Sequence, residues 1–183
     1  ITQLDFDHEI EHPHPKIRQT FFHLKDTSEF LIIDTCIQSH SREFWYTKEH
    51  ADEKVKILFD KSNVISFRDL DKIEFQNSQK TSIAELKKTF LFFQAWVMKG
   101  VNRDNFLEAL SYYHSFILEP LVELLRIRYQ PTKQKFGLKH IERDIPNDVL
   151  KILENLYKVN STEEINTMAQ KANKLFFEVL DEV

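Results

Sequence analysis

The spacing of apolar residues changes near residue 80, and this change limits the folds that the chain can adopt. Before it, apolar residues gather in short segments, such as residues 19–24 and 30–37. After it, they recur at steps of three and four, beginning with Ile83, Leu86, Phe90, Phe93 and Val97. The first pattern is typical of strands and the second of helices. The sequence therefore predicts an α+β chain, in which a small, mostly antiparallel sheet precedes an up-and-down four-helix bundle.

The N-terminal part is expected to form strands. Residues 19–24 and 30–37 are predicted to pair as an antiparallel hairpin around a polar turn at residues 25–29, with the second strand central in its sheet. Residues 55–59 (VKILF) predict a further strand, followed by a turn. Residues 45–53 are expected to form a short helix.

Four helices are expected in the C-terminal part. The first stops at Gly100, and the second contains Pro120, which should kink or divide it. Pro146 opens the third helix, and residues 161–164 (STEE) have the spacing of a capping box that opens the fourth. The predicted domains are residues 1–75, an α+β domain, and residues 80–183, the helical bundle.

Scarce residue types exclude several kinds of chemistry. The single cysteine, Cys36, excludes an intramolecular disulfide and a cysteine-based zinc site. The two glycines, Gly100 and Gly137, are too far apart to build a phosphate-binding loop. A formal net charge of −4 disfavours non-specific binding to nucleic acid, and no apolar run approaches the roughly 20 residues of a membrane span. These features predict a cytoplasmic protein without membrane or specific nucleic-acid partners.

Asp34 is the foremost candidate for chemistry because it interrupts the apolar run of residues 31–37 (LIIDTCI). A carboxylate in a buried strand needs a cation, a set of donors or an open cleft. Metal-dependent phosphoryl-transfer sites use strand-borne carboxylates to hold Mg²⁺. The alternative is an aspartate at a strand end that caps a turn or pairs with a lysine.

Residues 19–37 (QTFFHLKDTSEFLIIDTCI) resemble the part of nucleotidyltransferases of the DNA polymerase beta superfamily that supplies the third active-site aspartate. The similarity is to bacterial antibiotic-adenylyltransferase-like proteins with a C-terminal helical substrate-binding domain. Residues 55–65 resemble their next strand and turn. Residues 119–126 (EPLVELLR) and 143–146 (RDIP) resemble their helical domain, so that the resemblance covers about residues 19 to 183.

The resemblance implies transfer of a nucleoside monophosphate from a nucleotide triphosphate to a hydroxyl of a small-molecule acceptor. Asp34 would be catalytic and would bind Mg²⁺, and the helical bundle would bind the acceptor. The family's Gly-Ser turn and first Asp-x-Asp strand are not present in this chain, and are expected upstream of Ile1. Asp5 and Asp7 have the Asp-x-Asp form without that turn, so they are weaker metal candidates; the alternative for them is a polar edge strand.

Four residues of the helical part are candidates for binding the substrate: Glu119, Glu123, Tyr113 and Arg126. Glu119 and Glu123 are four residues apart and share a helix face, which would suit a cationic acceptor such as an aminoglycoside. They could equally pair with Arg126 and Arg128. Arg126 begins a basic stretch that could hold a triphosphate or lie in solvent at a helix C-terminus. Tyr113 is also consistent with the bundle core.

Residues 9–14 (EIEHPH) form an acidic and histidine-rich cluster. One interpretation is a metal site that uses His12 and His14, and the other is an extended proline-rich loop. For the whole chain, the alternative function is a non-catalytic helical binding module or a partner subunit of a separate nucleotidyltransferase. A homodimer is also left open.

Overall fold

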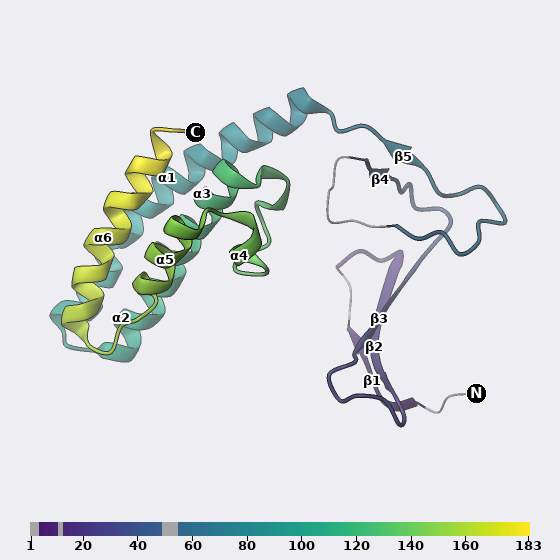
Figure 1. The fold of residues 1–183 in the computed structure, drawn as a ribbon, viewed down its shortest axis with the longest axis horizontal. Coiled ribbons are helices and arrows are strands. Elements are labelled where there is room, and N and C mark those ends of the chain that lie inside the picture. The colour runs from purple at the N-terminus through teal and green to yellow at the C-terminus, as the bar shows by residue number, and fades with distance from the viewer. Residues whose placement is uncertain (1–3, 11–12, 49–54) are drawn as a thin grey trace. The chain divides into compact units, whose positions relative to one another are not determined.

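The computed structural model describes residues 4–10, 13–48 and 55–183, and it is α+β. The chain divides into two compact units, Ile1–Leu70 and Asp71–Val183. Strands belong to the first unit and helices to the second (Figure 1). The sequence pattern placed the start of the helices near residue 80. The first helix begins earlier, because Asp71 caps its N-terminus. Its carboxylate accepts the backbone N–H groups of Ile73 and Glu74 at 3.0 and 2.9 Å.

The first unit contains a three-stranded antiparallel sheet. Its strands are β1 (Leu4–Ile10), β2 (Ile17–Leu24) and β3 (Ile33–Gln38), in the order β1-β2-β3. The predicted hairpin and its turn at residues 25–29 are confirmed, with Asp26 at a φ of 61° in the turn. The prediction that the second strand of the hairpin is central is wrong. In the part of the chain that the structure describes, β2 is central and β3 pairs with β2 alone.

The apolar residues before β3 are exposed. Phe30, Leu31 and Ile32 lie in the turn and the segment after it, and Phe30 is 86% exposed. No described side chain of the first unit is buried. An apolar run is buried only where a second layer packs on it. The run at residues 30–37 therefore predicted a strand correctly and its burial wrongly.

Two further local predictions in this unit are not met in the residues that the structure describes. Residues 55–59 form no strand, and the chain instead closes a turn at Asp60, whose carboxylate accepts the N–H groups of Val64 and Ile65 at 3.0 and 3.1 Å. These two bonds lower the pKa of Asp60, because they stabilise the ionised carboxylate. In place of the helix predicted at 45–53, the structure has β4 (Tyr46–Thr47), parallel to β5 (Phe67–Arg68); residues 49–53 lie outside the described residues.

The second unit is helical. Its α-helices are α1 (Lys72–Asn102), α2 (Phe106–Tyr113), α3 (Glu119–Tyr129), α4 (Ile141–Asp144), α5 (Asn147–Leu156) and α6 (Thr162–Leu180). A π-turn, His114–Leu118, joins α2 to α3, and a short 3₁₀ turn, Pro131–Lys133, follows α3. Half of the predicted capping box is present at α6, where the Ser161 hydroxyl accepts the Glu164 N–H at 3.2 Å. The Glu164 carboxylate accepts the N–H of Asn160, at 2.7 Å, in place of that of Ser161.

The apolar stripes of these helices form a core of their own. α1 and α6 lie side by side (Figure 1), and the rings of Phe90 and Phe176 stack between them with centroids 3.7 Å apart. Leu121, Leu124 and Leu125 of α3 are fully buried in the same core. Each such side chain contributes about 1.5–3 kcal/mol when it is removed from water. Among the described residues, none of the helices combines the length and the apolar composition that a membrane span needs.

Gly100 and Pro120 act differently in this core. The sequence predicted that α1 stops at Gly100, but the helix continues to Asn102. It instead permits close approach of α2, since a Cβ atom at position 100 would lie 2.8 Å from the Cα of Ala109. Pro120 divides its helix as predicted. It has no N–H for an α-helical bond, and the π-turn lies directly before α3.

Candidate ligand-binding site

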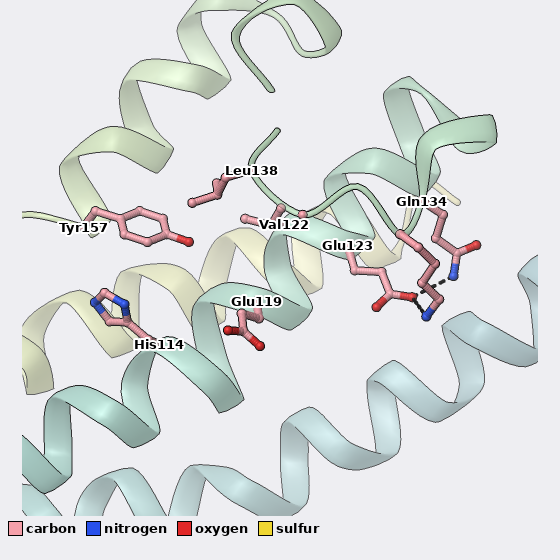
Figure 2. Close-up of a pocket in the computed structure, with 9 residues that line it drawn as sticks. His114, Glu119, Val122, Glu123, Gln134, Leu138 and Tyr157 are labelled. Atoms are coloured by element: carbon pink, nitrogen blue, oxygen red, sulfur yellow. Dashed lines mark hydrogen bonds and ion pairs between the residues drawn. The ribbon is translucent and has the colours of Figure 1, made fainter. Parts of the chain in front are cut away.

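A pocket of about 370 Å³ lies in the helical unit at the start of α3. Side chains of the π-turn and of α3 line one side, the loop after α3 lines a second, and Tyr157, just after α5, lines a third (Figure 2). Small-molecule sites commonly have volumes of roughly 300–1,000 Å³ and a few convergent polar groups. Two of the predicted substrate-binding residues, Glu119 and Glu123, line this pocket.

Glu123 holds the loop against α3. Its carboxylate accepts a hydrogen bond from the Gln134 side-chain amide at 2.7 Å and pairs with the Lys135 ammonium group (Figure 2). Its side chain is 21% exposed. The negative charge of Glu123 is therefore already balanced by a residue of the same pocket.

Glu119 differs from Glu123 because its carboxylate makes no hydrogen bond or ion pair with any other described residue. It lies one turn before Glu123 on the same face of α3. The pocket thus contains one balanced carboxylate and one unbalanced carboxylate, and its own residues leave a net negative charge near Glu119.

The Tyr157 hydroxyl points toward the centre of the lining residues (Figure 2). Burial, and to a smaller extent the charge of Glu119, raise the pKa of Tyr157 to about 12. The hydroxyl is therefore protonated at neutral pH and can donate a hydrogen bond. The ring of His114 packs edge-to-face against the Tyr157 ring, with centroids 5.3 Å apart.

Tyr113, the third predicted substrate-binding residue, lies in the core and not in the pocket. Its side chain is fully buried, and its hydroxyl donates to the Leu156 carbonyl at 2.9 Å. Burial raises its pKa well above the ordinary value for tyrosine. The neighbouring residue, His114, is the one that reaches the pocket.

Arg126, the fourth predicted substrate-binding residue, is fully buried and fixes the loop that lines the pocket. Its guanidinium donates to the carbonyls of Gly137 and Lys139, both at 2.6 Å, and to the Asp144 carboxylate at 2.8 Å. Lys133 donates to the other oxygen of Asp144 at 2.6 Å. Burial alone would raise the pKa of Asp144, but its bonds to Lys133 and Arg126 outweigh this effect and lower it.

The alternative pairing of Glu119 and Glu123 with the arginines of α3 is wrong. Arg126 pairs with Asp144, and Arg128 pairs with Glu182 near the C-terminus. Of the other basic residues, Lys133, Lys135 and Arg143 also contact carboxylates, Arg143 with Glu142 at 3.5 Å. A triphosphate would therefore have to compete with these ion pairs.

Asp34 lies on β3 and is exposed, which corrects the expectation of a buried carboxylate. The side-chain amide of Gln19 on β2 donates to both of its oxygens at 3.0 Å. A Mg²⁺ site needs about six oxygen ligands, and the side chains described around Asp34 do not supply such a set. Where side chains are described, no group of three or more His, Cys, Asp or Glu residues is placed to hold a metal ion.

The weaker metal candidates fall largely outside the description. Asp5 and Asp7 lie on β1, at the edge of the described sheet, and their side chains are outside the described part of the structure. Of the acidic and histidine-rich cluster, Glu11 and His12 lie outside the described residues. His14 is exposed, and its Nδ1 accepts the Lys16 N–H at 3.1 Å.

Comparison of the chain with protein-family models, with curated proteins and with solved structures found no match. The interpretation of the pocket therefore depends on its own geometry. The sequence did not indicate Tyr157 as a site residue, and it placed Lys135 only within the basic stretch that could hold a triphosphate. The positions of both depend on the loop and α5 folding back onto α3, which cannot be predicted from local patterns.

Proposed function

We propose that the helical unit binds a small organic cation in this pocket, as the acceptor-binding part of a nucleotidyltransferase-like protein. The observation that carries the proposal is the Glu119 carboxylate, which lines the pocket without a basic partner among the described residues. Glu119 is exposed to solvent, and its carboxylate is free to accept charge-assisted hydrogen bonds from a cation. An ammonium group on the ligand supplies both the charge and the donors.

The two glutamates have separate roles in this proposal. Glu123 keeps the loop in place through Gln134 and Lys135, and Glu119 binds the ligand. The apolar surfaces of Val122 and Leu138 contact the carbon skeleton beside the ammonium group. The pocket therefore favours a compact amine over an anion.

The reaction class comes from the resemblance of residues 19–37, and not from the pocket. In the proposed reaction a nucleoside monophosphate passes from a nucleotide triphosphate to a hydroxyl of the bound acceptor. Asp34 is the proposed catalytic carboxylate, and its exposure leaves it accessible to a ligand. Mg²⁺ there would require oxygen ligands beyond those of the described side chains. In this proposal α1, α2–α3, α5 and α6 are the helices of an up-and-down four-helix bundle, and the packing of α1 against α6 supports it.

A transfer assay tests this function. The protein is incubated with an α-labelled nucleotide triphosphate, Mg²⁺ and a panel of hydroxylated amines, and label on the amine is measured. Asp34→Asn should abolish transfer, Glu119→Gln should raise the KM for the amine alone, and Glu29→Gln, a change to an exposed carboxylate near the same hairpin, should change neither. Amine binding without any transfer would favour the non-catalytic binding module. If Glu119→Gln transfers the label with an unchanged KM for the amine, the pocket does not bind the acceptor of the reaction.

A further inference from the structure

The π-turn before α3 brings His114 into the pocket. Within this turn the Glu119 N–H donates to the His114 carbonyl, a bond that spans five residues. In a continuous α-helix, two residues five positions apart point in directions about 140° apart. Across this five-residue bond, both side chains instead line the same pocket (Figure 2).

Pro120 accounts for the turn at this position. Proline cannot donate to the carbonyl four residues before it, and its ring clashes with that carbonyl in a regular α-helix. The wider π-turn relieves the clash, and the chain resumes as an α-helix at Glu119. Turns of this kind are found frequently at functional sites.

The side chain of His114 has hydrogen-bonding capacity that the described residues do not use. Its imidazole makes ring contacts with Tyr113 and Tyr157 but no hydrogen bond with a described residue. The Tyr157 hydroxyl likewise makes none. In its neutral form an imidazole offers one acceptor and one donor, and a phenol offers a donor and an acceptor. The two groups can therefore accept from and donate to a single hydroxyl.

We propose that His114 is a specificity-determining residue of this pocket, which together with Tyr157 binds a hydroxyl group next to the ammonium group of the ligand. The inference rests on the proposed function, because it takes an ammonium group at Glu119 as its starting point. It adds a requirement that Glu119 alone does not impose. A plain amine satisfies Glu119 and leaves His114 and Tyr157 without a partner.

Three matched probes separate these contributions: cyclohexylamine, trans-2-aminocyclohexanol and cyclohexanol. Their affinities for the whole chain are measured by NMR titration. One additional neutral hydrogen bond corresponds to about a fivefold gain in affinity, so that two correspond to about 25-fold. The amino alcohol should therefore bind about 25-fold more tightly than the amine, and also more tightly than cyclohexanol, which lacks the ammonium group.

His114→Phe keeps a ring against Tyr157 and removes the hydrogen bond. In this variant the ratio of the two affinities should fall to about fivefold, because Tyr157 still bonds the hydroxyl. Tyr157→Phe provides a second test that also retains its ring, and helicity measured by circular dichroism verifies that each variant is folded. Ser115→Ala changes an exposed residue of the same turn that does not line the pocket, so it should keep the ratio of the unmodified protein, about 25-fold.

The outcomes distinguish this inference from the function on which it rests. Equal binding of the two amines by the unmodified protein, or an affinity ratio that His114→Phe leaves unchanged, would overturn the role of His114 and leave Glu119 as the cation site. Failure of both amines to bind would overturn the cation site and the role of His114 together.

Discussion

Arg126 is the most strongly coordinated side chain described in the helical unit. It is fully buried, and its guanidinium reaches two carbonyls and the Asp144 carboxylate, whose side chain is only 3% exposed. A buried ion pair adds little net stability by itself, but removing one partner leaves the other unbalanced. Arg126 therefore controls the shape of the loop that lines the pocket, although it does not line the pocket itself.

Replacing Arg126 tests this role. Arg126→Met should lower the free energy of unfolding of the helical unit by about 3–5 kcal/mol, because Asp144 loses a partner and two carbonyls lose their donor. Arg126→Lys should recover little, since an ammonium group lacks the planar set of donors. Arg143→Met, at a side chain that is 73% exposed, serves as the control. Urea unfolding followed by helical circular dichroism measures all three, and equal stability of Arg126→Met and the control would refute the role.

The lowered pKa of Asp144 predicts how stability depends on pH. A carboxylate with a lower pKa in the folded state contributes stability that is present above its unfolded-state pKa, about 3.9. That contribution is lost as the pH falls through the lower, folded-state value. Urea unfolding of the unmodified chain between pH 3 and pH 7 should show this loss on the acidic side, and Asp144→Asn should show a smaller loss. An identical acid dependence in the two proteins would exclude Asp144 as a source of it.

At the scale of elements, local signals predicted the helices better than the strands. The stripes of α1 and α6 and the Ser161 cap depend on neighbours within a few residues, so they were visible in the sequence. The order of the strands depends on partners distant along the chain, and the apolar run before β3 falsely suggested a central, buried strand. For the same reason the sequence placed Glu119 and Glu123 on one face but missed Tyr157.

Gly100 gives an element-scale prediction. Gly100→Ala should destabilise the protein by about 1–3 kcal/mol, because the added methyl group would overlap Ala109 and push α2 away from α1. Helix propensity alone predicts a stabilisation of about 1 kcal/mol from the same change. Ala84→Gly, on the exposed side of α1, measures that propensity separately in the same urea experiment. A stabilised Gly100→Ala protein would contradict the close approach of the two helices.

At the scale of the whole molecule, the buried apolar core belongs to the helical unit, and its residues lie between Leu86 and Val179. A unit with its own core can fold without the rest of the chain. The fragment of residues 71–183 should therefore be helical and should unfold in one cooperative transition near that of the helices in the whole chain. Circular dichroism during heating measures both, and a fragment without a cooperative transition would contradict an independent core.

Binding of cyclohexylamine to the whole chain, measured by calorimetric titration, tests the central claim most directly. Glu119→Gln should weaken binding about tenfold or more, because it removes the charged partner of the ammonium group. Glu154→Gln, at an exposed carboxylate of α5, should bind as the unmodified protein does. Equal affinities in the unmodified protein and in Glu119→Gln would show that the pocket does not bind cations through Glu119.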